Sequence, residues 1–233
     1  MKLLTTPLRS FLDLLYPPCC EVCGRLLVAN EHTICTQCKY ELPLTLFWES
    51  TDNPAARLFW GKVAVEQASS FFYFTKGSPY RKLMHKLKYK GKTDIGVTLG
   101  RWYGEKLAQS ALYQTVDIVV PLPLHAKRLK RRGYNQSELI AEGIADAMQK
   151  SLDTASLQRT VYTETQTNKS RMERWKNVES VFKVANPQLL NGKHVLLVDD
   201  ILTTGATLEV CALSLLEAAS CKVSVATLGI AVY

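Results

Sequence analysis

The sequence predicts an α/β fold, in which a parallel β-sheet is flanked by helices and preceded by a small cysteine-rich module. From Val116 onward, apolar runs of strand length alternate with segments of helical length, which is typical of parallel sheets with crossover helices. Two Cys-x2-Cys units lie close together near the start of the chain, and this spacing is typical of a metal-bound module. We therefore divide the chain into residues 1–48, 49–110 and 111–233.

Length and charge restrict the classes of partner. The chain has 233 residues, with 29 Lys and Arg against 21 Asp and Glu and a formal net charge of +8. This excess favours phosphate-bearing partners without choosing between nucleotides, nucleic acid and anionic lipid. No apolar run reaches the roughly 20 residues that span a bilayer. We expect a cytoplasmic protein without a membrane span, whose start forms a short amphipathic helix through Leu8, Phe11, Leu12 and Leu15.

The first region, residues 1–48, contains five of the seven cysteines. Two thiolates from each Cys-x2-Cys unit would complete a tetrahedral zinc site with no open position. The predicted structural zinc ligands are Cys20, Cys23, Cys35 and Cys38. Two alternatives stay open, because Cys19 could replace Cys20 and His32 could replace a cysteine. A redox-active pair is a weaker interpretation, since one unit would suffice for that chemistry.

The second region, residues 49–110, is predicted to contain a strand at 69–74, a basic stretch at 76–92 and a helix at 98–110. The basic stretch has seven Lys and Arg residues, two tyrosines and no acidic residue. Cations and aromatic rings are the ingredients of a groove for single-stranded nucleic acid, so single-stranded DNA is a candidate partner. Leu83 and Leu87 at helical spacing indicate that one face is core, and the basic face is then explained equally well by solvation.

The third region, residues 111–233, carries the sheet. Its predicted strands are 116–120, 194–198 and 222–230, and its predicted helices are 136–150 and 206–219. Ligands of such sheets bind at the carboxyl ends of the strands. A basic loop follows the strand at 116–120, and a hydroxyl-rich loop follows the strand at 194–198. The sequence therefore predicts a ligand site at this edge of the sheet.

The hydroxyl-rich loop has the composition of a site for ribose and phosphate. Backbone amides at a helix start attract anions, and Gly205 lets the backbone approach a phosphate closely. Asp199 and Asp200 can accept hydrogen bonds from adjacent ribose hydroxyls, or hold a hydrated divalent cation. An ordinary helix cap would explain one hydroxyl and leave the acidic pair unexplained. The predicted phosphate-binding residues are Thr203, Thr204, Gly205, Ala206 and Thr207.

The basic loop begins at Pro121 and Leu122 and carries five cations within residues 127–132, without one acid. Such a cluster is either a solvated helix end or, facing the acidic pair, a receptor for pyrophosphate. The predicted ligand-binding residues of this loop are Pro121, Leu122, Arg128, Arg131 and Arg132.

A polar segment at 165–178 precedes the strand at 194–198. It is either an exposed basic linker or a loop that closes over the reacting centre and adds cations there. In the second interpretation, Arg171 and Arg174 are the predicted catalytic cations.

Residues 195–208 are similar to the signature of the type I phosphoribosyltransferases. Together with the cysteine module, the Pro-x-Pro loop and the segment at 165–178, they resemble the ComF family over most of residues 16–232. The resemblance implies a type I phosphoribosyltransferase fold with an N-terminal zinc module. It also implies a site in which Asp199 and Asp200 hold the ribose of phosphoribosyl pyrophosphate with magnesium, and residues 203–207 hold its 5-phosphate. Purine-salvage members have an aspartate where this chain has Thr203, which counts against a purine acceptor.

Two functions follow from this resemblance. As an enzyme, the protein would transfer the phosphoribosyl group to an acceptor that the sequence does not indicate, with release of pyrophosphate. As a binding protein, it would sense phosphoribosyl pyrophosphate, or only retain the pocket, while it handles single-stranded DNA during natural transformation with a partner from the competence machinery.

Overall fold

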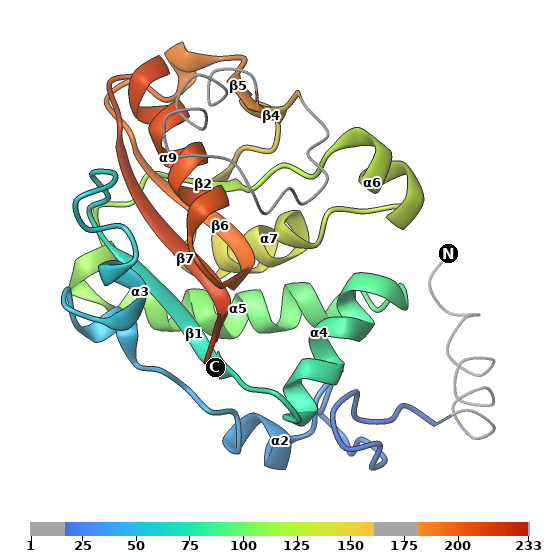
Figure 1. Cartoon of the computed structure of the whole chain (residues 1–233). Coiled ribbons are helices and arrows are strands. Elements are labelled where there is room, and N and C mark those ends of the chain that lie inside the picture. Colours follow the sequence, from blue (N-terminus) through green and yellow to red (C-terminus); the bar gives the residue numbers. More distant parts are fainter. Residues whose placement is uncertain (1–16, 161–180, 233) are drawn as a thin grey trace.

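The computed structural model describes residues 17–160 and 181–232, and its centre is a five-stranded parallel sheet (Figure 1). The strands are β1 (Ala68–Phe74), β2 (Ile118–Pro121), β3 (Ser151–Leu152), β6 (His194–Leu202) and β7 (Lys222–Ala231). Their order across the sheet is β1-β7-β6-β2-β3, and every neighbouring pair is parallel. The predicted α/β fold class is confirmed.

Helices cover both faces of the sheet, because side chains of the central strands alternate between two hydrophobic clusters. On β6, Val195 and Leu197 belong to the cluster that includes α9 (Ala206–Ala218). Leu196 and Val198 belong to the other cluster, with α5 (Asp94–Gln109) and α7 (Gln136–Met148). A strand that is buried on both faces has a continuous apolar sequence, which is why this strand was predictable.

The remaining described elements are shorter. The helices are α2 (Thr36–Tyr40), α3 (Pro54–Arg57), α4 (Pro79–Tyr89) and α6 (Ala126–Arg132), and three-residue 3-10 turns lie at Phe47–Glu49, Ala111–Tyr113 and Pro187–Leu189. Two further strands, β4 (Leu157–Arg159) and β5 (Phe182–Val184), form a separate antiparallel pair. Within residues 17–160 and 181–232, no helix is both long and apolar enough to cross a bilayer.

Helix α5 begins at Asp94, four residues before the predicted start at 98. The first turn was hard to predict because Gly96 is a poor helix former. The structure gives a reason for the glycine, since a Cβ atom at Gly96 would lie 2.9 Å from Leu139 Cβ on α7. The early start therefore reflects helix packing, which local propensity does not contain.

The packing of α5 against α7 gives a prediction on stability. A Cβ atom at Gly143 would lie 2.3 Å from Val97 O and 2.6 Å from Arg101 N, two backbone atoms of α5. We expect the Gly143→Ala variant to lose about 1–3 kcal/mol of unfolding free energy, because the helices must move apart. Urea denaturation measures this loss. The exposed Glu142→Ala variant on the same helix is the control and should stay within about 0.5 kcal/mol of the wild type; equal midpoints for the two variants would contradict the packing.

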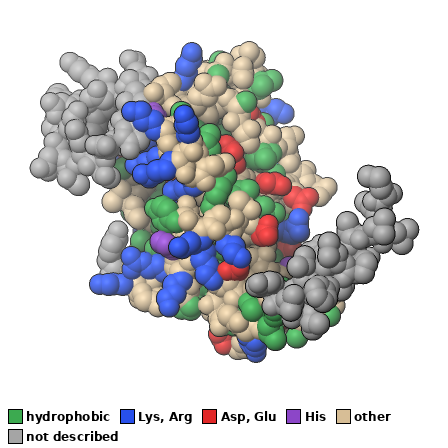
Figure 2. All heavy atoms as spheres, turned by 90° about the vertical axis from the view of Figure 1, so that its right-hand side faces the viewer, with side chains coloured by type: hydrophobic (Ala, Val, Ile, Leu, Met, Phe, Trp, Pro, Cys, Tyr) green, Lys and Arg blue, Asp and Glu red, His purple; other side chains and the backbone are tan. Residues whose placement is uncertain are grey.

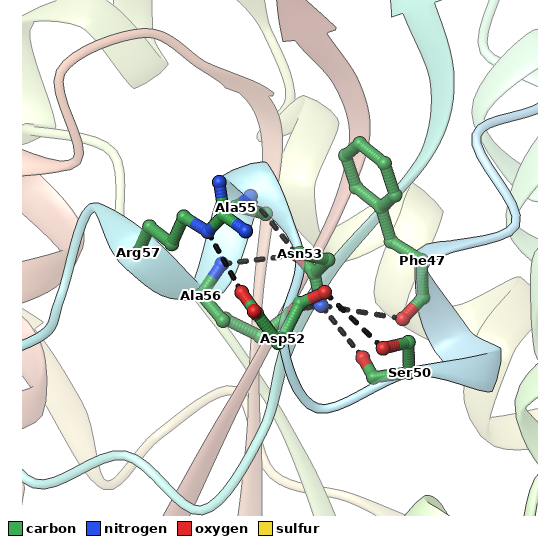
Figure 3. A network of polar contacts seen from close by, with 8 residues as sticks. Phe47, Ser50, Asp52, Asn53, Ala55, Ala56 and Arg57 are labelled. Atoms are coloured by element: carbon green, nitrogen blue, oxygen red, sulfur yellow. Dashed lines mark hydrogen bonds and ion pairs between the residues drawn. The ribbon is translucent and has the colours of Figure 1, made fainter.

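Asn53 fixes the segment before β1 to the sheet (Figure 3). Its amide nitrogen donates to Phe47 O at 3.3 Å, to Ser50 O at 2.8 Å and to Ala68 O at 3.0 Å. Its Oδ1 accepts from the first amides of α3, at 2.9 and 3.0 Å. The side chain is 4% exposed, so its hydrogen bonds are made away from water. This network positions α3 and the Phe59 ring that follows it.

The cysteine module packs on α4, the helix of the basic stretch. The Tyr80 hydroxyl donates to Cys38 O at 2.7 Å, and Leu83 and Leu87 are fully buried in the cluster that also contains the module's buried cysteines. The prediction that one face of this helix is core is confirmed. In Figure 1 the module and α4 lie together at the end of the molecule away from β4 and β5.

Candidate functional site

A cavity of about 240 Å³ opens at the carboxyl ends of β2 and β6, the edge of the sheet at which the sequence predicts a ligand. The end of β2 lies beside Val198 of β6, because Leu122 N donates to Val198 O at 2.7 Å. The residues lining the cavity come from α4, the β2–α6 loop, α6, α7, β4, β6 and α9. They are Lys88, Tyr89, Leu122, Pro123, Leu124, Arg128, Arg132, Gln136, Ser137, Arg159, Asp199, Asp200 and Thr207.

The acidic pair forms the floor of this cavity. Both residues lie within β6, which continues to Leu202 because β7 remains paired beside it; the predicted strand end at 198 was too early. The Ser137 hydroxyl donates to Asp199 Oδ1 at 2.9 Å, and the Asp200 amide donates to the same oxygen at 2.8 Å. Burial, and then the negative charge of Asp200, raise the pKa of Asp199 to about 7. Such a paired, desolvated carboxylate is typical of a functional site.

The hydroxyl-rich loop connects β6 to the start of α9. Gly205 has φ +77°, in the left-handed region that favours glycine, and it is the residue that caps α9. Two carbons of the Phe59 ring, Cε1 and Cζ, lie 3.5 Å from the place that a Cβ atom on Gly205 would occupy. The ring therefore packs against the loop at this glycine. The three threonine side chains of the loop are exposed, and Thr207 is the loop residue that lines the cavity. The first amides of a helix lack intrahelical acceptors, so this exposed turn is suited to an anion.

Part of the basic loop is helical and forms α6. This helix places part of the predicted cation cluster at the cavity. Arg128 and Arg132 line the cavity from one face of this helix. Arg131 is exposed and is not among the lining residues, and Pro121 is buried in β2. Asn135 connects this loop to α7, because its amide donates to Leu122 O at 3.0 Å while its Oδ1 accepts from Ser137 N at 3.1 Å.

Sequence reasoning missed several residues that line the cavity. Ser137 and Gln136 follow the basic loop directly, so their place at the start of a helix beside a strand end was an available signal. Lys88 and Tyr89 come from α4 and Arg159 comes from β4, far away in the sequence. Local motifs carry no signal for such long-range neighbours. The predicted N-terminal helix and the segment at 165–178, with Arg171 and Arg174, lie outside the described residues.

The second candidate site is the cysteine cluster. The Sγ atoms of Cys20, Cys23, Cys35 and Cys38 all lie within 4.8 Å of one another. Cys19 instead points its thiol at Pro17 O, at 3.4 Å. His32 does not belong to this group, which is the only group of three or more metal-binding side chains found within the described residues. Four thiolates without an open position fit a structural zinc ion.

The chain matches two family models that correspond to these two sites. The model of a phosphoribosyl transferase domain matches residues 134–232, and the model of a double zinc ribbon domain matches residues 11–46. The first match includes the acidic pair and the hydroxyl-rich loop, and the second includes the cysteine cluster.

Curated relatives resemble the chain over most of its length. It is 29% identical to the DNA utilization protein YhgH of Salmonella typhimurium, over 88% of this chain and 87% of that protein. It is 26% identical to the competence protein ComFC of Bacillus subtilis, over 85% and 71% of the two chains. It is 34% identical to competence protein F of Haemophilus influenzae over a shorter region, 40% of this chain and 41% of that one.

Solved structures similar to this fold are more distant. The allosteric regulatory enzyme of purine biosynthesis has a TM-score of 0.43 and 22% identity, and the match covers 61% of this chain and 29% of that enzyme. An adenine phosphoribosyltransferase has a TM-score of 0.36 and 16% identity, and the match covers 62% and 75%. A phosphoribosyl transferase domain that follows a double zinc ribbon, in a chain similar to competence proteins, is consistent with the ComF family.

Proposed function

We propose that the cavity at the ends of β2 and β6 binds phosphoribosyl pyrophosphate together with magnesium, and that the protein transfers the phosphoribosyl group to an acceptor in the cytoplasm. The observation that carries this proposal is the shared cavity of an acidic pair, a helix start with exposed hydroxyls, and arginines. These are the groups that ribose, a phosphate monoester and pyrophosphate each require. A reducing cytoplasm would also keep the four clustered cysteines available for metal.

The residues present fit a magnesium ion that arrives with the ligand. Asp200 is 5% exposed, and its Oδ2 makes no hydrogen bond among the described residues, although the Lys88 ammonium lies 2.8 Å from it as an ion pair. Carboxylate oxygens are hard ligands of the kind magnesium prefers, and magnesium is usually held by one or two carboxylates and by substrate phosphates. Asp199 and Asp200 would hold the hydrated ion or the ribose hydroxyls, and the ion would supply positive charge beside the pyrophosphate.

The chemical step needs positioning and charge more than a protein nucleophile. The acceptor would form a bond to the anomeric carbon as the bond from that carbon to pyrophosphate breaks, and the bonding electrons would leave with pyrophosphate. Residues 203–207 would hold the 5-phosphate, and the acidic pair would orient the ribose. Arg128 and Arg132 would stabilise the departing charge. Arg131, Arg171 and Arg174 are further candidates for that role.

A pyrophosphate-release assay tests transfer. The protein, phosphoribosyl pyrophosphate and magnesium would be incubated with a panel of bases, amines and oligonucleotides. Release that depends on one acceptor class would establish an enzyme and identify the class. Ligand binding without release for any acceptor would contradict transfer and would favour a sensor.

The alternative function, handling of single-stranded DNA, is supported by a second cavity of about 460 Å³. It is lined by Lys82, His85, Lys86, Lys90, Lys92 and Glu21. Lys and Arg side chains gather on the side of the molecule shown in Figure 2, which displays the right-hand side of Figure 1. Glu21 offsets part of this charge, because it contacts Lys86 at 2.9 Å and Lys92 at 2.8 Å. The presence of a DNA utilization protein and competence proteins among the relatives favours this candidate.

Oligonucleotide titration at several salt concentrations tests the DNA alternative. Affinity that falls steeply with salt, and that the Lys82→Glu, Lys90→Glu variant loses, would support it. The absence of any affinity in the intact protein at low salt would rule it out.

A further inference from the structure

Lys88 reaches the acidic pair from a part of the chain that the phosphoribosyl transferase model does not include. Its Nζ lies 2.8 Å from Asp200 Oδ2, and the side chains are 26% and 7% exposed. That model begins at residue 134, whereas Lys88 lies on α4. The Lys88 ammonium and the Asp200 carboxylate form an ion pair but no hydrogen bond. Asp200 Oδ2 can therefore still accept a hydrogen bond from a ligand. Lys88 therefore lines the cavity with a positive charge that residues 134–232, the part matched by the phosphoribosyl transferase model, do not supply.

The end of α4 that carries Lys88 is fixed against the cavity on both sides. The Tyr134 hydroxyl donates to Leu87 O, the residue before Lys88. The Arg132 guanidinium lies 5.4 Å from the centre of the Tyr89 ring, the residue after it. Arg132 is the last residue of α6 and lines the site, and Tyr134 lies between α6 and α7. The backbone of Lys88 is thus connected to the loop that we propose receives pyrophosphate.

The cysteine module also contacts α4, through Tyr80 near the start of the helix and Lys86 in its last turn. The Lys86 ammonium donates to Glu21 O at 2.8 Å and to Glu21 Oε2 at 2.9 Å. The Tyr80 hydroxyl donates to the backbone carbonyl of Cys38, one of the clustered cysteines. One helix therefore contacts the module through Tyr80 and Lys86, and the acidic pair through Lys88.

We propose that Lys88 is a ligand-positioning residue of this site, and that the cysteine module acts on the site by holding α4 in place. The proposal rests on the proposed function of the cavity. Lys88 keeps the Asp200 carboxylate oriented toward the ribose, and its charge attracts the phosphates of the ligand. Without Lys88, the site would have one cation fewer beside its two adjacent carboxylates. The strongly anionic ligand would then be repelled more by these carboxylates.

Calorimetric titration of the full chain with phosphoribosyl pyrophosphate and magnesium tests this role. Lys88→Met should weaken binding by at least about tenfold, because truncating one member of a desolvated charge pair is costly. Lys88→Arg keeps the charge and should recover most of the affinity. Lys106→Met makes the same chemical change at an exposed position of α5 and should bind like the wild type. If Lys88 had only a structural role, Lys88→Arg would not be expected to recover the affinity that Lys88→Met loses.

Further variants separate the outcomes. If Lys88→Met does not fold, Lys88→Gln still offers Asp200 a hydrogen-bond donor, and it should show the same loss at an unchanged melting temperature. Wild-type affinity, or tighter binding, in the folded Met or Gln variant would overturn the role of Lys88. If binding is lost in an Asp199→Asn, Asp200→Asn variant but unchanged in Lys88→Met, the proposal for Lys88 fails alone. If the wild type does not bind the ligand, the proposed function fails, and the proposal for Lys88 fails with it.

Discussion

Replacing Asp199 and Asp200 together by asparagine is expected to lower the affinity for magnesium and phosphoribosyl pyrophosphate by at least about a hundredfold, since each lost charged hydrogen bond costs about 1.5–3 kcal/mol. The shape of the cavity floor should remain. An asparagine at 199 can still accept the hydrogen bonds from the Ser137 hydroxyl and the backbone amide of residue 200. What the variant loses is negative charge at the position where ribose hydroxyls and the metal would bind.

Isothermal titration calorimetry and a thermal melt measure this effect together. The variant should retain the melting temperature of the wild type within a few degrees while its binding heat disappears. The control is Glu142→Gln, which makes the same kind of change, from acid to amide, at one exposed position of α7. Equal affinity in the double variant and the wild type would show that the acidic pair is not the ribose site.

Removing zinc from the cysteine cluster is expected to have the second large effect. Structural zinc contributes about 10–16 kcal/mol to the folding of isolated zinc-finger peptides. Here the module also packs on α4, so we expect Cys38→Ser to lose at least about 3 kcal/mol of unfolding free energy. A loss of about 3 kcal/mol corresponds to a melting temperature lower by about 6–12 °C for a chain of this size.

Metal analysis and thermal melts check this expectation. The wild type should contain one zinc ion per chain, and Cys38→Ser should contain less. The matched control is Cys19→Ser, because the Cys19 thiol lies next to the cluster in sequence but points at Pro17 O. If Cys19→Ser loses zinc and Cys38→Ser retains it, the ligand set drawn from the structure is wrong.

The fold and the floor of the site were predictable because their signals are local. The apolar run at 194–198, the acidic pair and the loop at 203–207 are contiguous, and each has a physical reason for its residue types. The fold class followed from the alternation of strands and helices. The four clustered cysteines followed from their spacing, and the structure adds that Cys19 points away from them.

The walls of the site were not predictable, because they depend on packing between distant elements. Lys88 belongs to a stretch of seven similar cations, and nothing in that stretch distinguishes the one that meets Asp200. Arg128 and Arg132 lie at the cavity while Arg131 is exposed, and this difference depends on the orientation of α6. The glycines between α5 and α7 likewise reflect a contact that a single helix does not encode.

A crystal structure of the full chain soaked with phosphoribosyl pyrophosphate and magnesium tests the central claim most directly. The account predicts that the ribose hydroxyls contact Asp199 and Asp200, and that the 5-phosphate lies at the backbone amides of residues 203–207. It also predicts that the pyrophosphate faces Arg128 and Arg132. Ligand density in the cavity lined by Lys82 and Lys90 instead, or no density between β6 and α9 at saturating ligand, would contradict it.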